Sequence, residues 1–156
     1  MAAANSLSLP KPWPDFLKEI EAQLSQPVKL HCLGGFVPTA LYGIPRFTAD
    51  LDYIDAAPAT AADELEKIAG RASTLGKKYK LFVQNVGIAD LPENYESRLQ
   101  ELNVDLKKLK LWALGPYDLL LAKVTRNSPK DQEDAKYLIA KMKLDFKTFY
   151  DRWEKS

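Results

Sequence analysis

The sequence predicts an α+β (mixed α/β) fold: a small sheet flanked by helices, followed by a helical C-terminal portion from about residue 116. Short apolar segments with strand character and longer segments with helical spacing follow one another in mixed order, without the strict alternation of a doubly wound protein. The 156 residues match the length of one domain and are sufficient to bury a core. We expect residues 1–12 to form a flexible N-terminal arm and residues 13–156 to form a single domain.

The amino-acid composition excludes several classes of protein. The 22 basic and 21 acidic residues leave a formal net charge of +1, which argues against broad, charge-driven coating of nucleic acid. The one cysteine, Cys32, cannot form an internal disulfide, which fits a reducing compartment. No apolar stretch approaches the ~20 residues that span a bilayer, and the first 14 residues lack the apolar core of a signal peptide. We therefore expect a cytoplasmic protein without a membrane partner.

The first half of the chain contains three expected strands and three expected helices. A helix that starts near Pro14 shows Phe16, Ile20 and Leu24 at helical spacing, and Pro27 ends it. The other expected elements are strands at 28–33, 50–54 and 79–86, a helix at 36–42 closed by Gly43, and a helix at 61–75 ended by Gly76 and the lysines at 77 and 78.

The second half contains one expected strand and four expected helices. Residues 106–114 alternate apolar and polar side chains, which is typical of a strand. Ser128 and Pro129 begin a helix, because serine is a good N-cap and proline suits the first helical position. The remaining helices are expected within 90–103, from 116 to 126, and from about 145 to the end.

The segment from Leu30 to Asp55 carries the most informative pattern. A strand ends at Gly34 and Gly35 and a helix begins at once, which lets the backbone approach a ligand and favours a bound anion such as phosphate. Asp50 and Asp52 then share one face of a strand, because successive strand side chains point to opposite faces. Two carboxylates on one face repel each other unless a cation lies between them, and Mg²⁺ prefers such oxygen ligands.

The order strand, glycine pair, helix, loop and D-x-D strand is more specific than any of its parts. With the string YGIPRFTADLDYI, it resembles the nucleotidyltransferase superfamily (DNA polymerase beta-like), and in particular the minimal nucleotidyltransferases and the AbiEii-type toxins of toxin–antitoxin modules. The later string DLLLAKVTRNSPKDQEDAKYL is similar to their second motif, a lysine on one helix and R/K-D-x-x-D on the next. The resemblance covers about residues 30–138.

This resemblance implies a chemistry and a set of residues. It implies Mg²⁺ (or Mn²⁺) held by Asp50 and Asp52, an NTP donor, and an acceptor hydroxyl on RNA, tRNA included, or on a protein. A cognate toxin or antitoxin protein is the implied partner. The implied catalytic residues are Asp50, Asp52 and Asp134, with Asp52 and Asp134 as alternative bases, and the implied nucleotide-binding residues are Gly34, Gly35, Arg46, Thr48 and Lys123.

Several of these residues keep an alternative explanation. Lys123 shares the apolar face of its helix, so it either extends toward solvent or meets an anion. Asp134 fits an ion pair with Lys123 or Arg126 as well as a catalytic acid. Arg46 fits a phosphate contact and an ion pair with the aspartates equally, and Thr48 fits a loop cap better than a ligand contact.

Other polar residues near the motifs favour structural roles. Tyr42 is expected to pack and Asp131 to interact with the dipole of its helix. His31 and Cys32 make no set of zinc ligands.

A third carboxylate, which active superfamily members often supply from a neighbouring strand, is expected within residues 82–90. This stretch offers Asn85, an amide, and Asp90 in the following loop, while Asp55 faces away from Asp50 and Asp52 if its strand is regular. Three functions therefore remain open: an enzyme, a nucleotide-binding or protein-interaction module of the same fold, and a structural protein with an incidental D-x-D.

Overall fold

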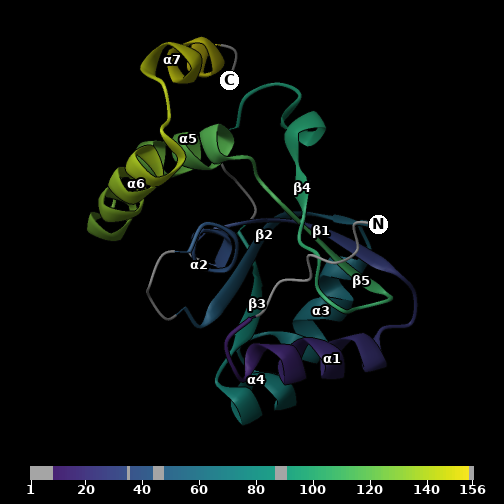
Figure 1. Ribbon diagram of the computed structural model, residues 1–156. Coiled ribbons are helices and arrows are strands. Elements are labelled where there is room, and N and C mark those ends of the chain that lie inside the picture. The colour runs from purple at the N-terminus through teal and green to yellow at the C-terminus, as the bar shows by residue number, and fades with distance from the viewer. Residues whose placement is uncertain (1–8, 35, 44–47, 87–90, 155–156) are drawn as a thin grey trace.

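The computed structural model describes residues 9–34, 36–43, 48–86 and 91–154 (Figure 1). The fold is α+β, as predicted, with a five-stranded mixed sheet. In chain order the elements are α1 (Trp13–Gln23), β1 (Val28–Leu33), α2 (Phe36–Leu41), β2 (Asp50–Ala57), α3 (Ala61–Ala69), α4 (Thr74–Tyr79), β3 (Phe82–Asn85), a 3-10 turn (Tyr95–Arg98), β4 (Gln100–Glu101), β5 (Leu109–Ala113), α5 (Pro116–Arg126), α6 (Pro129–Met142) and α7 (Phe146–Glu154).

The sheet has the strand order β3-β2-β1-β5-β4, so β1 lies at its centre. Strand β1 pairs antiparallel with β2 and parallel with β5, while β2 pairs parallel with β3 and β4 antiparallel with β5. Side chains alternate between the two faces, and the core face carries Leu30, Cys32, Leu51 and Tyr53. The opposite face of β2 carries Asp50 and Asp52, which are both partly exposed.

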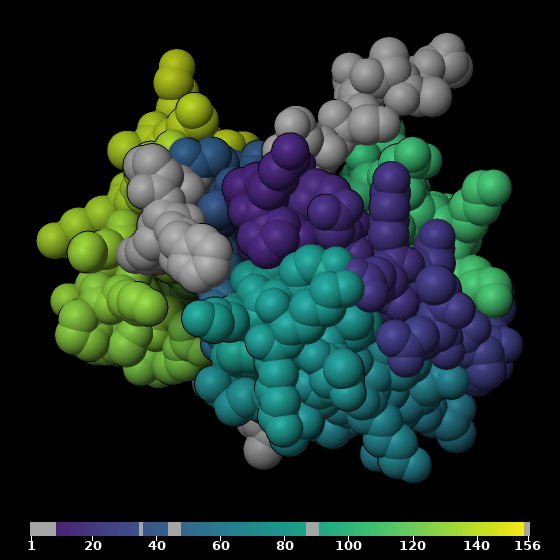
Figure 2. Space-filling view, turned by 90° about the horizontal axis from the view of Figure 1, so that it is seen from below, coloured from purple at the N-terminus to yellow at the C-terminus, as the bar shows by residue number. Residues whose placement is uncertain are grey.

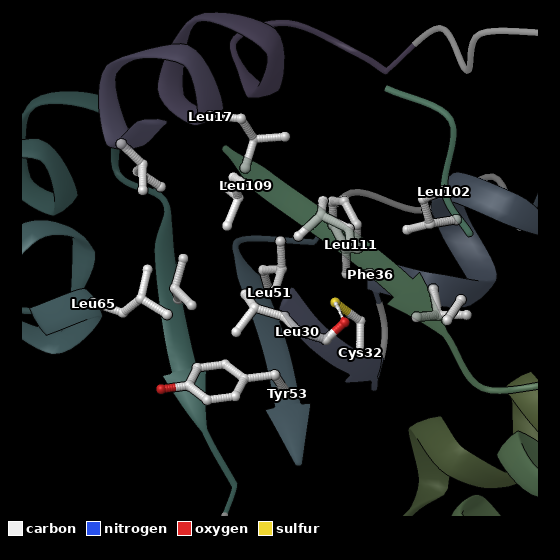
Figure 3. Packing of buried hydrophobic residues seen from close by; sticks show 14 of the residues in the cluster. Leu17, Leu30, Cys32, Phe36, Leu51, Tyr53, Leu65, Leu102, Leu109 and Leu111 are labelled. Carbon is white, nitrogen blue, oxygen red and sulfur yellow. Dashed lines mark hydrogen bonds between the residues drawn. The ribbon is translucent and has the colours of Figure 1, made fainter. Parts of the chain in front are cut away.

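Helices α1 and α3 cover the core face of the sheet. Figure 3 shows Leu17 of α1 and Leu65 of α3 packing toward Leu30, Leu51 and Leu109 of three neighbouring strands. Figure 2 shows the molecule from below, with α1 in purple next to the teal helices and the yellow-green C-terminal helices to one side. Each large apolar side chain that is fully buried here contributes roughly 1.5–3 kcal/mol.

A β-bulge changes the face of one acid. Tyr53 pairs with Cys32, but the next pair joins Asp55 to His31, so Ile54 is an extra residue in β2. Because of this extra residue, Asp55 lies on the face of His31, which is also the face of Asp52. The expectation that Asp55 faces away from the acidic pair is therefore wrong, since it assumed a regular strand.

The expected helix at 61–75 is two helices. Helix α3 ends at Ala69, and Ser73 caps α4 by accepting a hydrogen bond from the backbone N of Gly76 at 2.9 Å. Gly76 therefore lies inside α4 rather than after it. Because α4 continues to Tyr79, β3 begins at Phe82 and not at residue 79 as expected.

The segment between β3 and β5 also differs from expectation. The short helix expected near residue 92 is the 3-10 turn, and β4 follows it without a clear signal in the sequence. Strand β5 starts three residues later than expected, at Leu109. At this start, Glu21 Oε1 of α1 accepts hydrogen bonds from the backbone N of Lys107, Lys108 and Leu109 at 2.6, 2.6 and 3.0 Å. The expected bounds of β1 and α5 and the expected starts of α6 and α7 are confirmed to within about one residue.

Helices α5 and α6 pack side by side, and α7 lies over α5 at the periphery of the molecule (Figure 1). Ser128 joins α5 to α6 through a capping box: its Oγ accepts from the backbone N of Asp131, and Asp131 Oδ2 accepts from the backbone N of Ser128, both at 3.1 Å. None of the helices in the described ranges has the length and apolar character needed to cross a membrane.

The capping box makes a testable contribution to stability. Ser128→Ala removes the cap, so we expect the free energy of unfolding to fall by about 1–2 kcal/mol in urea denaturation. The control is Ser97→Ala, whose hydroxyl donates to the backbone O of Asn94 in an exposed turn and whose loss changes stability by less than about 0.5 kcal/mol. Equal effects of the two substitutions would contradict this assignment.

Candidate functional site

The site is built around the turn that follows β1. Gly34 has φ +78°, a left-handed conformation that favours glycine, and a Cβ at this position would lie 3.0 Å from Cβ and Cγ of Asp52. Leu33 pairs with Asp52 in the antiparallel β1–β2 ladder. The main chain at the end of β1 is therefore packed directly against the Asp52 carboxylate.

Asp50 and Asp52 share one face of β2, as the alternation predicted. Both are partly exposed, whereas Leu51 and Tyr53 between and after them are buried on the other face. Burial and, secondly, the neighbouring Asp50 carboxylate raise the pKa of Asp52 to about 6. The pair is thus an accumulation of negative charge that a cation would relieve.

Three basic side chains oppose this charge. Arg126 and Lys123 of α5, together with Arg71 after α3, act electrostatically on the Asp52 carboxyl and partly offset the rise of its pKa. The Arg71 guanidinium lies 3.8 Å from the centroid of the Phe82 ring, and Phe82 is the backbone partner of Asp50 in β3. The basic groups of the second motif, about 70 residues further along the chain, therefore act on the acidic pair of the first motif.

Lys123 lies inside the interface between α5 and α6. Its side chain is only 3% exposed, and its Nζ lies 2.8 Å from Asp134 Oδ2 and 3.7 Å from Asp131 Oδ1. The ion pair with Asp134, one of the alternatives left open by the sequence, is present. Extension of the lysine into solvent was the other explanation for its position on an apolar helical face, and the structure does not show it.

Arg126 combines a fixed orientation with access to solvent. Its Nε and Nη2 donate to the two carboxylate oxygens of Asp131, each at 2.7 Å, while its side chain stays 58% exposed. Burial would raise the pKa of Asp131, but the Arg126 guanidinium and Ser128 hold it below its usual range. A ligand role for Arg126 was not expected from the sequence, although its position three residues after Lys123 indicates a shared helical face.

The strand next to β2 presents an amide to the site, but not the expected one. Gln84 pairs with Asp52 and shares its face, whereas Asn85 pairs with Tyr53 and hydrogen-bonds to its hydroxyl. The expectation that Asn85 occupies the position of a third carboxylate is therefore wrong, because the register of β3 against β2 places Gln84, and not Asn85, beside Asp52. Among the described residues, no group of three or more His, Cys, Asp and Glu side chains could hold a metal ion.

The remaining candidates take structural positions or lie outside the described ranges. Gly35, Arg46 and Asp90 belong to the latter group. Thr48 Oγ1 donates to the backbone O of Asp50 at 3.3 Å, as a loop cap would. Tyr42 is buried and donates to the backbone O of Leu114 at 3.4 Å, as expected for a packing residue.

His31 and Cys32 point to opposite faces of β1. The Cys32 thiol is buried in the core, where burial raises its pKa, and His31 Nδ1 lies 3.1 Å from the Tyr95 hydroxyl. This divergence agrees with the sequence-based rejection of a zinc site at the two residues.

Comparison with known proteins supports a nucleotidyltransferase-like domain. A family model described as nucleotidyltransferase of unknown function (DUF6036) matches residues 14–155, which include both motifs. No curated protein and no solved structure matches the chain. The match extends to the superfamily; the narrower resemblance to AbiEii-type toxins stays a prediction.

Because the pKa of Asp52 is raised, replacing this residue by an uncharged one should stabilise the folded protein, and the size of the effect should depend on pH. The folded protein holds the Asp52 proton up to about pH 6, whereas an unfolded chain releases it near pH 4, so ionisation destabilises the folded state. Asp52→Asn should raise the free energy of unfolding at pH 7 by about 1–2 kcal/mol, allowing for partial solvent exposure. The gain should be complete above about pH 6 and vanish below about pH 4. Denaturation curves across this range test it, and a gain independent of pH would contradict it.

The buried ion pair between Lys123 and Asp134 predicts that substitutions of the two residues have non-additive effects on the free energy of unfolding. Lys123→Met leaves Asp134 buried without its ammonium partner, so we expect a loss of about 3–5 kcal/mol in the free energy of unfolding. The double variant Lys123→Met/Asp134→Leu removes both charges and should recover most of that loss. Additive losses in the double-mutant cycle, measured by denaturant unfolding, would argue against the pair as the link between α5 and α6.

Proposed function

Since the chain belongs to the family of nucleotidyltransferases of unknown function, we propose that it is a Mg²⁺-dependent enzyme that transfers a nucleotidyl group from an NTP to a hydroxyl acceptor. The observation that carries this proposal is the packing of Gly34 against Asp52. The Gly34 turn lies against two carboxylates that share one face of β2, and the charges of Arg126, Lys123 and Arg71 act on Asp52.

The carboxylates of Asp50 and Asp52 fit a divalent cation. Mg²⁺ or Mn²⁺ is commonly held by one or two carboxylates together with substrate phosphates, which matches a pair that lacks a third acid among the described residues. Such an ion aligns the phosphates and neutralises the charge that develops during transfer.

The chain's own groups then receive distinct roles. The Gly34 backbone lies against the Asp52 carboxylate, so a phosphate bound through a cation at the acidic pair would lie near the end of β1. The exposed Arg126 guanidinium would offer its remaining donors to the triphosphate. Lys123 is a positioning residue, because its ammonium holds α6 through Asp134 and Asp131 and so fixes the residues that orient Arg126. Gly35, Arg46 and Thr48 remain nucleotide-binding candidates on the resemblance alone.

The acceptor hydroxyl needs a base to take its proton. Asp134 is buried and engaged with Lys123, so it has no access to an acceptor without breaking that pair. Asp52 is partly exposed on the open face of the sheet. Of the two candidates, the geometry therefore favours Asp52.

The acceptor class and the biological setting rest on the resemblance. An RNA end, tRNA included, or a protein hydroxyl within a cytoplasmic toxin–antitoxin system is the proposed acceptor. The second candidate function is a catalytically inactive nucleotide-binding or protein-interaction module. It is favoured by one observation: Gln84 stands beside Asp52, where a third carboxylate would complete the site.

Label transfer tests the proposal. The purified chain is incubated with each α-labelled NTP, Mg²⁺, total RNA and lysate protein, beside the isosteric Asp50→Asn/Asp52→Asn variant. We expect the native chain alone to label RNA or protein, and removal of Mg²⁺ to abolish labelling. Asp55→Asn, on the same strand beyond the bulge, is the matched control and should keep full activity.

Three other outcomes separate the alternatives. Labelling that persists in the double variant would overturn the assignment of the site. No labelling, with an NTP-dependent rise in melting temperature that the double variant loses, would favour the binding module. In that case Gln84→Glu, which adds a third carboxylate beside Asp52, tests whether the missing acid is the reason.

A further inference from the structure

The large apolar side chains that are exposed in the described residues all lie on the three C-terminal helices. Phe146 and Trp153 of α7 are 77% and 54% exposed. We call the set the C-terminal apolar surface; it comprises Val124 of α5, Ile139 and Met142 of α6, and Phe146, Tyr150 and Trp153 of α7. In Figure 1 these helices stand apart from the helices that cover the sheet.

The surface is continuous rather than scattered. Val124, Ile139 and Phe146 line one groove of about 210 Å³ between α5, α6 and the start of α7. From there the Phe146 and Tyr150 rings are 6.0 Å apart between centroids, and the Tyr150 and Trp153 rings 6.3 Å. The three aromatic residues recur at spacings of four and three, which places them along one stripe of α7.

The size of the surface is at the upper end of the range for apolar patches on a monomer. With side-chain areas of about 150–250 Å² for aromatic residues, the exposed fractions amount to roughly 600 Å² of apolar surface. The largest apolar patch on a typical monomer is about 300–600 Å², and a stable interface buries about 800 Å² on each partner. The apolar surface supplies most of that area, and the charged residues that flank it on α7 would have to supply the rest.

We propose that a second copy of this chain covers the C-terminal apolar surface, with α7 packed antiparallel on α7 of the other copy. Lys147 and Glu154 are seven residues apart, two helical turns, and therefore flank the aromatic stripe on one side. A two-fold axis near Tyr150 brings Lys147 of each copy opposite Glu154 of the other, so that symmetry creates two ion pairs.

The charges of α7 favour this occupant over a nucleic acid. The helix carries Lys147 and Arg152 against Asp151 and Glu154, so it has no excess of positive charge. A balanced helix suits a copy of itself, whereas a nucleic acid partner requires a basic surface. The proposal is independent of the proposed enzymatic function, because none of its residues belongs to the acidic pair.

Sedimentation velocity on the full chain tests the proposal. We expect a monomer–dimer equilibrium between ~1 and ~200 µM, the range of interfaces of modest size. Phe146→Ser/Trp153→Ser, which changes exposed residues only, should weaken dimerisation at least about tenfold while circular dichroism stays unchanged. Lys147→Glu and Glu154→Lys should each weaken it by about three- to tenfold, since each replaces two attractions by two repulsions.

The double reversal Lys147→Glu/Glu154→Lys distinguishes the antiparallel arrangement. It should restore native dimerisation, while Lys77→Glu on α4, the charge-matched control, should leave it unchanged. A chain that stays monomeric at all concentrations, or a dimer insensitive to these reversals, would overturn the proposal. If the native chain is monomeric and binds RNA, and if Phe146→Ser/Trp153→Ser abolishes that binding, the surface would be assigned to nucleic acid instead.

Discussion

The close packing of the Gly34 backbone against the Asp52 carboxylate is the constraint on which the site depends. It requires a left-handed residue at the end of β1 and leaves no space for a side chain there. The same contact agrees with the antiparallel register in which Leu33 lies opposite Asp52. One steric condition thereby fixes how β1, Gly34 and the acidic pair lie relative to one another.

A second level of organisation is the charge network between α5 and α6. Lys123 is buried between two aspartates, and Asp131 in turn orients the exposed Arg126. A buried lysine is tolerated only with such partners, because the desolvation of an unpaired charge is strongly unfavourable. The network therefore serves two purposes: it joins the two helices, and it directs positive charge toward Asp52.

Local signals predicted the parts of the fold and site that depend on neighbours in the chain. The face shared by Asp50 and Asp52 follows from strand alternation, and the start of α6 follows from Ser128 and Pro129. The break between α3 and α4 was missed because Ser73 acts as an N-cap within a segment that otherwise reads as one helix. That error shifted the expected start of β3. The choice of Asn85 over Gln84 has a different cause, because the register between β2 and β3 cannot be read from either strand alone.

By itself, the sequence determined the α+β class, the glycine turn, the acidic pair and the basic second motif, since each depends on residue type and spacing within one segment. Only the tertiary structure decided that Gln84 stands beside Asp52, that the bulge at Ile54 turns Asp55 to the same face, and that Lys123 is held by Asp134. The physical reason is that strand register and helix packing are set by contacts between distant segments, and a shift of one residue moves a side chain to the other face.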